Sequence, residues 1–269
     1  MFSDKRNIAT LTILLKEHGV RQAVVCPGSR NAAIVNNLTE CKEIECFAAT
    51  DERSAAFEAM GISLATGLPT VVCVTSGSAL LNTLPAVAEA WYQHVPLIVV
   101  SADRPAAWIE QLDGQTLEQP GALKRWCTES VNLPEVKDEV EHWNCNWLVN
   151  RALLMTKHHL RPVHINVPLS EPLYNFNREK LGDERVVRLR NTEDLVKGFA
   201  ECEKVMIIVG QERDVPDLVK LSESAAVVAE PLAWCGIWSD GESFIEEMEE
   251  PEMVIYFGGT IVSKRVKEF

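Results

Sequence analysis

The sequence is poor in basic residues, with 26 Lys and Arg against 39 Asp and Glu and a formal net charge of -13. Nucleic acids and anionic membranes bind to strongly basic faces, so this composition argues against both as the main partner. Any anionic substrate of this protein must therefore be bound by a few local arginines.

Long hydrophobic runs are also missing. No apolar stretch reaches the about 18 residues that a membrane-spanning helix needs. The first residues, MFSDKRN, contain no apolar signal core. We therefore expect no membrane insertion and a cytoplasmic location.

The eight cysteines include no Cys-x-x-Cys pair, which is the spacing typical of zinc and redox sites. Their apolar neighbours, as in VVC and VVCV, indicate small buried thiols. The six histidines form no recognisable ligand set. We therefore expect no metal site built from the residues of this chain.

Several common catalytic motifs are absent as well. The sequence contains no Walker loop, no G-x-G-x-x-G after a strand, no H-E-x-x-H and no G-x-S-x-G elbow. Ser76 has no general base that the sequence makes evident. These absences argue against nucleotide hydrolysis, a simple dinucleotide site, zinc proteolysis and serine hydrolase chemistry.

What the sequence does contain is an alternation of short apolar strands with helices. Predicted strands cover 23–26, 44–48, 70–74, 96–100 and 163–167, and helices cover 8–19, 32–38, 50–67, 79–93 and 140–158. Continuously apolar strands are buried on both faces, which favours a doubly wound, mostly parallel sheet of the α/β class. The aperiodic stretch 108–134 is predicted to be a long loop that carries part of a site.

The 269 residues, 46% of them hydrophobic, suffice for one or two domains. We expect a first domain over 1–172 and a charged, irregular linker over 173–190. A second, incomplete α/β domain is expected over 191–269. Its predicted strands are 205–209, 225–229 and 253–257, and its predicted helices are 192–201, 216–222 and 262–267.

The helix predicted between Thr50 and Gly67 has a well-defined start and end. Asp51 is suited to cap its N-terminus, which places Glu52 in the first turn, and Gly67 is suited to end it. Much of its surface consists of alanine and glycine, so it can pack closely against a partner. The simplest role for Glu52 is to complement the helix dipole, which contributes about 0.3 to 1 kcal/mol.

Four polar or charged residues follow predicted strands of the first domain: Arg30, Glu52, Ser76 and Arg104. In a parallel sheet, ligands bind beyond the carboxyl ends of the strands, and these residues are expected at that edge. Their shared location favours a functional role for Glu52 over a purely structural one.

Five short motifs occur in order at suitable separations. They are Cys26-Pro-Gly-Ser-Arg30, Asp51-Glu-Arg53, Val74-Thr-Ser-Gly-Ser-Ala79, Ala102-Asp-Arg-Pro105, and Gly114-Gln115 with Gln119-Pro-Gly121. This ordered set resembles the N-terminal half of the 2-succinyl-5-enolpyruvyl-6-hydroxy-3-cyclohexene-1-carboxylate synthases, thiamine-diphosphate enzymes of menaquinone synthesis. The resemblance covers residues 1 to about 172 and continues more loosely to the segment Gly258-Gly-Thr-Ile-Val-Ser-Lys264-Arg265.

The resemblance implies that the first domain binds the aminopyrimidine of thiamine diphosphate. Glu52 matches the glutamate that hydrogen-bonds the pyrimidine ring nitrogen, and a carboxyl group in an apolar pocket has the raised proton affinity that this contact requires. The cofactor's exocyclic amine then removes the thiazolium proton and forms the reactive ylid. Thr75, Ser76 and Gly77 match a loop beside the cofactor.

The resemblance also implies two dianionic substrates, 2-oxoglutarate, which is decarboxylated, and isochorismate, which receives the succinyl carbanion equivalent. Arg30 and Arg104 match arginines near the substrate carboxylates, a task that suits the guanidinium fork. Ser29 and Gln115 match polar substrate contacts. Lys264 matches a basic residue that the second domain directs at the site.

Relatives in this family are roughly twice as long and carry a third domain with a Gly-Asp-Gly segment that holds Mg²⁺ and the diphosphate. No such pattern occurs here, so we expect this chain to be an N-terminal fragment that is inactive alone. The family's site lies between domains of two subunits, which implies a homodimer or homotetramer.

Two other functions remain open at this point. One is another thiamine-diphosphate decarboxylase or an acetolactate-synthase-like enzyme, although such relatives lack the Pro-Gly-Ser-Arg and Ala-Asp-Arg-Pro arginines together. The other is a non-catalytic binding module that retains the fold. Surface or turn roles are the simpler alternatives for Arg30, Arg104 and Lys264.

Overall fold

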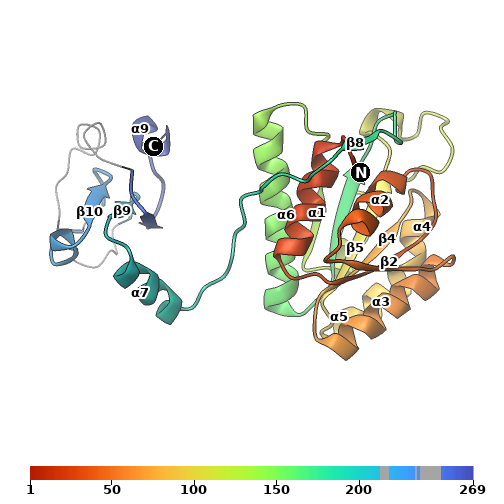
Figure 1. The fold of residues 1–269 in the computed structure, drawn as a ribbon, viewed down its shortest axis with the longest axis horizontal. Helices are drawn as coiled ribbons and strands as arrows, with labels where there is room; N and C mark the ends of the chain where they lie inside the picture. The colour runs from red at the N-terminus through yellow and green to blue at the C-terminus, as the bar shows by residue number, and fades with distance from the viewer. Residues whose placement is uncertain (213–217, 234, 237–249, 269) are drawn as a thin grey trace. The chain divides into compact units, whose positions relative to one another are not determined.

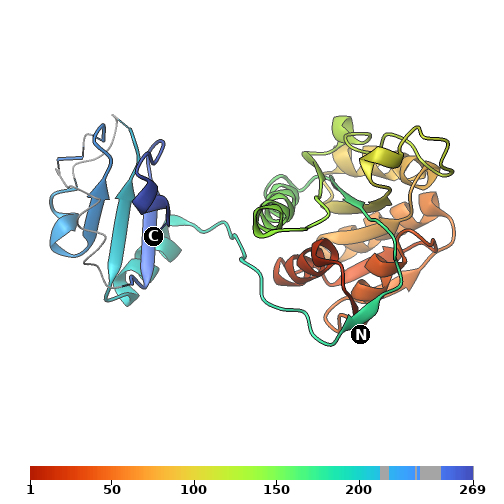
Figure 2. The same cartoon turned by 90° about the horizontal axis from the view of Figure 1, so that it is seen from above.

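The computed structural model describes residues 1–212, 218–233, 235–236 and 250–268. The chain divides into two compact units, Met1–Arg188 (unit 1) and Leu189–Phe269 (unit 2). Each unit is an α/β structure with its own parallel sheet (Figures 1 and 2). The α/β fold class predicted from the sequence is therefore confirmed.

Unit 1 is built on a parallel sheet of six strands in the order β3-β2-β4-β5-β7-β6. The strands are β2 Gln22–Val25, β3 Glu45–Ala48, β4 Thr70–Val74, β5 Leu97–Asp103, β6 Glu129–Asn132 and β7 Val163–Pro168. Every residue of β4 and β5 is buried, because helices cover both faces of the sheet. This burial explains why these strands are continuously apolar instead of alternating.

The helices of unit 1 form a layer on each face of the sheet (Figure 2). One layer holds α1 Arg6–Glu17, α2 Ala32–Glu40 and α6 Glu139–His159, and the other holds α3 Glu52–Thr66, α4 Ser78–Asn82 and α5 Leu84–Gln93. Short 3-10 helices lie at η1 Ala106–Trp108 and η2 Lys124–Trp126. The three layers leave the ends of the strands as the accessible edges of the unit.

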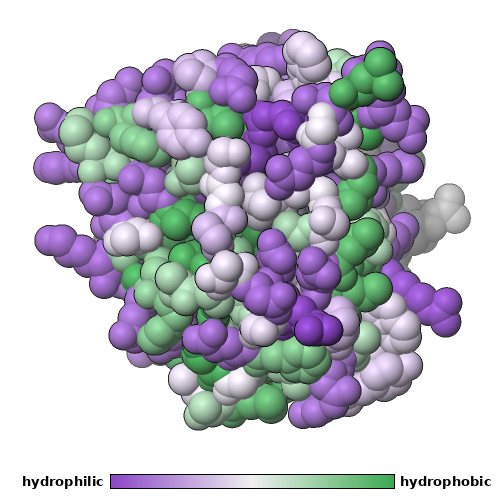
Figure 3. All heavy atoms as spheres, turned by 90° about the vertical axis from the view of Figure 1, so that its right-hand side faces the viewer, coloured by the Kyte–Doolittle hydropathy of each residue, from purple (hydrophilic) through white to green (hydrophobic). Residues whose placement is uncertain are grey.

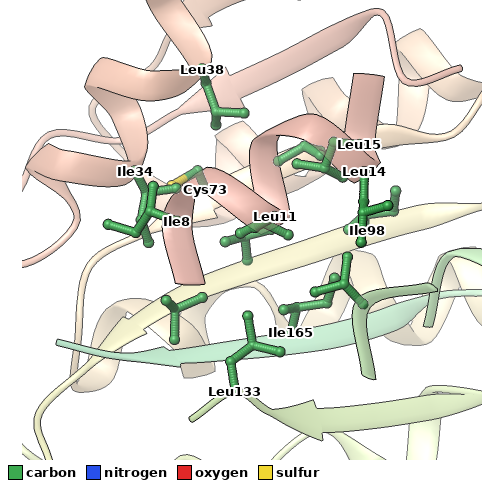
Figure 4. Packing of buried hydrophobic residues seen from close by; sticks show 14 of the residues in the cluster. Ile8, Leu11, Leu14, Leu15, Ile34, Leu38, Cys73, Ile98, Leu133 and Ile165 are labelled. Carbon is green, nitrogen blue, oxygen red and sulfur yellow. The ribbon is translucent and has the colours of Figure 1, made fainter. Parts of the chain in front are cut away.

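Helix α1 supplies much of the core on its side of the sheet. Ile8, Leu11, Leu14 and Leu15 are at most 1% exposed and point from α1 toward the strands, where Ile98 and Ile165 lie (Figure 4). A leucine or isoleucine buried in this way contributes about 1.5 to 3 kcal/mol. The helical spacing of these residues is the pattern that predicted the helix.

Three of the differences between the predicted elements and the structure concern the six-stranded sheet of unit 1 and its helices. The single helix expected over 79–93 is two helices that meet at Thr83, whose hydroxyl donates to Leu80 O at 2.7 Å. The second helix begins at Leu84, and Pro85 lies in its first turn. Strand β5 continues to Asp103, where a loop was predicted. Strand β6 lies inside the stretch that was predicted to be one long loop.

The segment predicted as a linker, 173–190, packs for most of its length on unit 1. Strand β8 (Phe176–Arg178) pairs antiparallel with β1 (Phe2–Ser3). Further along, the Glu184 carboxylate accepts hydrogen bonds from Thr10 at 2.6 Å and from Asn146 at 2.8 Å. The boundary between the units accordingly falls after Arg188.

Unit 2 contains a parallel sheet in the order β10-β9-β11. Its elements are α7 Thr192–Glu201, β9 Val205–Val209, η3 Leu221–Glu223, β10 Ala226–Ala229, β11 Met253–Phe257 and α9 Lys264–Glu268. The helix predicted over 216–222 falls partly outside the described residues, and its described part ends in η3. The apolar faces of the three strands form the core of the unit.

The eight cysteines are all free thiols, and Cys46 and Cys202 are half-buried while the others are buried. Burial raises the pKa of the thiols of Cys73, Cys127 and Cys145 to about 12. At neutral pH these groups are protonated and unreactive, as expected for structural cysteines. Within the described residues, none of the helices is both long enough and apolar enough to span a bilayer.

Candidate functional site

In the sheet of unit 1, the order in which the chain adds strands reverses at β2. The chain passes from β2 to β3 on one side and then crosses to β4 on the other side. Ligands of open α/β sheets bind beyond the carboxyl ends of the strands at such a point. The loops that follow β2, β3, β4 and β5 meet this edge, and they carry Arg30, Glu52, Ser76 and Arg104.

Arg30 lies between β2 and α2 and is only 8% exposed. Its Nη1 donates to Leu169 O at 3.0 Å, and its Nη2 lies 3.4 Å from Oε1 of the exposed Glu171. Burial lowers the pKa of the Arg30 guanidinium, and the positive charge of Arg104 lowers it further. The second effect is the repulsion expected between two like charges that line the same cavity.

Arg104 follows β5 and is oriented by a different set of contacts. Its Nε lies 2.8 Å from Oδ2 of Asp113, and its Nη2 donates to Gly114 O at 2.9 Å. Its backbone N–H donates to the carboxylate of Asp103 at 2.8 Å. The guanidinium group thus pairs with Asp113, while Asp103 binds the backbone of Arg104.

The two arginines line one cavity of about 390 Å³. Its wall consists of Arg30, Arg104, Pro105, Trp108, Asp113, Ser170 and Glu171. A guanidinium group can offer a bidentate hydrogen bond to a carboxylate, and this cavity has two such groups. Asp113 and Glu171 carry negative charges that balance part of their positive charge.

Glu52 is the first residue of α3, and its position is fixed by the cap of that helix. Asp51 accepts a hydrogen bond from the Ser54 backbone N–H at 2.8 Å, as the sequence predicted. The Glu52 side chain is half-buried and accepts a weak hydrogen bond from Asn82 Nδ2 at 3.4 Å. It does not line the cavity of the two arginines.

Glu52 follows β3, whose last residue, Ala48, pairs with Val25 at the end of β2. Burial raises the pKa of the Cys26 thiol, just after β2, to about 12, and the negative charge of Glu52 adds to this effect. Glu52 and Arg30 thus follow adjacent strands, whereas Arg104 follows β5, which β4 separates from β2.

The loop after β4 fits tightly against its neighbours. Thr75 and Ser76 are buried, and Gly77 has a φ of 82°, a conformation that favours glycine. A Cβ atom on Gly28, in the loop after β2, would lie 2.4 Å from Thr75 Cβ. Close packing between these two loops therefore requires glycine at position 28.

Gln115 contacts the same loop. Its Nε2 donates to Ser76 O at 3.1 Å, and its backbone has a φ of 59°. The structure thus brings Gln115 together with Ser76 and Gly77, which had been predicted as separate substrate and cofactor contacts. Ser29 is exposed in the loop before Arg30, at the same edge of the sheet.

Lys264 belongs to unit 2, where it begins α9. Its side chain is 86% exposed, and its Nζ lies 3.4 Å from Oε1 of Glu268, one helical turn further along. This contact is the surface pair expected for an exposed lysine on a helix.

Sequence reasoning missed several residues of the site. Asp113, Ser170 and Glu171 reach the arginine cavity from irregular segments, and Trp108 reaches it from the short 3-10 helix η1, none of which has a clear periodic signal. Asn166 had a signal, since it and His164 are polar residues inside the buried strand β7. Among the described residues, no group of three or more His, Cys, Asp or Glu side chains is placed to hold a metal ion.

Comparison with known proteins gives a consistent result. Residues 9–123 match the thiamine pyrophosphate enzyme, N-terminal TPP binding domain. Two similar proteins have the name 2-succinyl-5-enolpyruvyl-6-hydroxy-3-cyclohexene-1-carboxylate synthase. The one from Phocaeicola vulgatus is 46% identical to this chain, and the one from Bacteroides thetaiotaomicron is 44% identical. Both matches cover 100% of this chain and 53% of the similar protein. A protein of the same name from Desulfotalea psychrophila is 32% identical over 98% of this chain and 54% of its own length.

The chain thus spans about half the length of the curated relatives that it matches. The matched domain contains Arg30, Glu52, Ser76 and Arg104, and so covers most of the site described above. The chain is therefore a relative of the 2-succinyl-5-enolpyruvyl-6-hydroxy-3-cyclohexene-1-carboxylate synthases that corresponds to the N-terminal half of such a protein.

Proposed function

We propose that this chain is the N-terminal part of a thiamine-diphosphate-dependent synthase that decarboxylates 2-oxoglutarate and transfers the remaining four-carbon unit to isochorismate, in the cytoplasm, for menaquinone synthesis. The observation that carries this proposal is the pair Arg30 and Arg104, which line one cavity of about 390 Å³. Two guanidinium groups in such a cavity suit a dianionic substrate. Similarity to the synthases along the whole chain supports the same conclusion.

The residues at the sheet edge fit the aminopyrimidine of the cofactor. The carboxylate of Glu52 accepts a weak hydrogen bond from Asn82 at 3.4 Å, so it retains capacity for a hydrogen bond to a ring nitrogen. Gly77 has no side chain, and Gln115 Cγ lies 3.1 Å from where its Cβ would be, so glycine keeps this loop close to Gln115. When bound, thiamine diphosphate supplies the carbon nucleophile, and Glu52 holds or shares the proton at the pyrimidine nitrogen.

The other proposed contacts concern the substrates. Arg30 and Arg104 bind carboxylates, and their backbone and side-chain partners, Leu169 O and Asp113, fix the direction of each guanidinium group. Ser29 and Gln115 donate hydrogen bonds to the same molecules, with Gln115 held against the Ser76 loop. Lys264 adds a positive charge from the second domain in the complete protein.

We assign residues 1–172 to the pyrimidine-binding domain, 173–190 to the connection and 191–269 to part of a central domain. The Mg²⁺ ion and the diphosphate are expected to be held by oxygen ligands in the remaining half of the complete protein. This chain alone is therefore expected to lack catalytic activity.

We also propose a homodimer or homotetramer, with the surface of α3, α4 and α5 as a subunit contact. Phe57, Leu64, Leu81 and Tyr92 on these helices are 44%, 54%, 45% and 67% exposed. Hydrophobic patches between hydrophilic side chains are also visible on the face of the molecule in Figure 3. Apolar surface of this kind typically marks a contact between proteins.

The central test is Glu52→Gln in the complete gene product that contains this chain. Removing the ionisable group should lower kcat by at least about 100-fold, the range of a lost general acid or base. Glu58→Gln, a matched change on the exposed surface of the same helix, should leave kcat within about twofold. Circular dichroism should show both variants folded.

Substrate trials separate the proposal from its alternatives. Turnover of pyruvate but not of 2-oxoglutarate would favour an acetolactate-type enzyme. Normal turnover by Glu52→Gln would reject the role of this carboxylate. A folded complete protein that binds neither thiamine diphosphate nor a dicarboxylate would instead indicate a non-catalytic binding module.

A further inference from the structure

A buried network of polar side chains lies beneath the candidate site, between β5, β6 and β7. Its centre is Asn166 on β7, which is 0% exposed. Asn166 Nδ2 donates to Asp103 Oδ2 and to Asn132 Oδ1, both at 2.8 Å. Its Oδ1 accepts hydrogen bonds from Ser101 Oγ at 2.7 Å and from Gln119 Nε2 at 2.8 Å. All the hydrogen-bonding capacity of this amide group is therefore used.

The contacts of Ser101 give the network a direction. The Ser101 hydroxyl donates to Asn166, so the His164 Nε2 atom, 2.8 Å from Ser101 Oγ, must carry a hydrogen and donate to it. The other ring nitrogen of His164 then accepts from Ser130 Oγ at 3.3 Å. The hydrogen bonds consequently point from Ser130 through His164, Ser101 and Asn166 toward the Asp103 carboxylate.

Two branches connect this network to the site. In the first, the other carboxylate oxygen of Asp103 accepts the backbone N–H of Arg104 at 2.8 Å, directly beside the arginine cavity. In the second, Gln119 Oε1 accepts the backbone N–H of Gly77 at 2.7 Å. Gln119 is 0% exposed, and its Nε2 also donates to Ala102 O at 3.0 Å.

The bridge from Gly77 to Asn166 requires an amide side chain. The group at position 119 must accept a hydrogen from Gly77 and donate one to Asn166 at the same time, which an uncharged amide does. Removing it leaves the Gly77 N–H and Asn166 Oδ1 buried without these partners, a costly arrangement. The Gly77 loop and the Asp103–Arg104 segment then lose the hydrogen bonds that connect them through Gln119.

We propose that Gln119 and Asn166 are positioning residues that hold the Gly77 loop and the Asp103–Arg104 segment at a fixed separation, so that the cofactor side and the substrate side of the site are set relative to each other. Neither side chain lines the arginine cavity. Their effect on cofactor binding rests on the proposed function, whereas their effect on the loops does not.

The first test is amide hydrogen exchange at Gly77 in the complete gene product, measured by mass spectrometry with single-residue fragmentation. Gln119→Met, of similar volume but without polar atoms, should accelerate exchange at Gly77 by at least about tenfold, consistent with the loss of a buried hydrogen bond. The control is Asn150→Leu, because Asn150 is an equally buried amide that bonds Asn146 O and Arg185 O away from the site. Asn150→Leu should leave the exchange rate of Gly77 within about twofold of the wild-type rate, since Asn150 has no link to the Gly77 loop.

The second test uses Gln119→Glu, which keeps the shape of the side chain. The introduced carboxyl group donates to Asn166 only when protonated, so the network is restored at acidic pH and broken when the group ionises. The Kd for thiamine diphosphate, from calorimetry, should exceed that of the wild type by at least about tenfold at pH 8. At pH 5.5 the two values should agree within about threefold, since the lost donor is regained.

The outcomes separate this inference from the proposed function. If Gly77 exchange in Gln119→Met equals that of the wild type, the positioning role is wrong whatever the activity. If Gln119→Glu binds the cofactor equally weakly at both pH values, the role is also wrong, because a general loss of stability explains the effect. If the wild type binds no thiamine diphosphate, the proposed function fails, while the exchange measurement still decides the positioning role.

Discussion

Nε of Arg104 lies 2.8 Å from Oδ2 of Asp113, and the same guanidinium group donates to the carbonyl of Gly114. These two contacts occupy one edge of the planar group and direct the other toward the cavity that it shares with Arg30. A planar guanidinium group can bind different partners along two of its edges at the same time, whereas an ammonium group has no such edges. The pairing therefore predicts that lysine cannot replace arginine at position 104.

The first prediction concerns Arg104→Lys in the complete protein. A lysine cannot hold Asp113 and present a bidentate edge to a carboxylate, so the KM for 2-oxoglutarate or isochorismate should rise at least about tenfold. Arg21→Lys, at an exposed position before β2, is the matched control and should leave both KM values unchanged. Equal KM values for Arg104→Lys and the wild type would contradict the assigned role.

The second prediction concerns pH and His164. Burial lowers the pKa of His164 from 6.5 to about 4, so between these values the unfolded state binds a proton that the folded state does not. Stability therefore rises with pH across this range, and the imidazole contributes about 3 kcal/mol to the loss between pH 7 and pH 4. Denaturant unfolding should show a smaller loss for His164→Gln. The exposed control His159→Gln should keep the wild-type slope.

The third prediction compares two glycines. Gly28→Ala places a Cβ atom 2.4 Å from Thr75 Cβ and 2.6 Å from Asn31 Oδ1 and should destabilise the fold by about 1 to 3 kcal/mol. Gly61, inside α3, has no atom within 4 Å of an added Cβ. Gly61→Ala should therefore stabilise the monomer by up to about 1 kcal/mol through helix propensity. Thermal unfolding of both variants tests the pair, and a stabilising Gly28→Ala would show that the loops can separate.

The fourth prediction concerns the segment before Arg188. Glu184 is bonded by Thr10, Asn146 and His142, so Glu184→Ala should cost about 1 to 3 kcal/mol and open the segment 173–188 to protease. Glu179→Ala, at an exposed position nearby, should change neither property. Limited proteolysis with mass mapping gives the cut sites. An uncut segment in Glu184→Ala would mean that the pairing of β8 with β1 suffices to hold it.

The fifth prediction tests the proposed subunit contact. Leu64→Glu places a charge on the exposed apolar surface of α3 and should lower the mass of the complete protein in light scattering. Leu195→Glu is the control, because Leu195 is similarly exposed at 47% on α7, against 54% for Leu64. If Leu64→Glu keeps the wild-type mass, the contact lies elsewhere.

Much of the fold followed from hydrophobic pattern because the strands are covered on both faces. The strands at 70–74, 205–209 and 253–257 have the bounds that the sequence predicted. Strand β6, with the sequence ESVN, escaped prediction because it is short and only Val131 in it is buried. Its place in the sheet depends on pairing with β7, a tertiary contact that local pattern does not contain.

The candidate site was predictable only in part, for a similar reason. The strand-end rule located Arg30 and Arg104, and the structure brings both to one cavity. The same rule gave no indication of Asp113 or of Glu171, which reach that cavity from irregular segments. Gln119 stood out in the sequence only as a turn residue, and its bond to Gly77 spans 42 positions along the chain.

Because the six strands of the sheet in unit 1 run in one direction, the unit has one rim where the strands begin and another where they end. Only the second rim carries the candidate site. At the rim where the strands begin, Gly19, Gly67, His94 and Leu160 end helices in left-handed conformations, remote from the site residues. A fluorophore, an affinity tag or a new pair of termini introduced at Gly19, between α1 and β2, should therefore leave ligand binding intact. That rim offers the practical point of attachment for following this protein in solution.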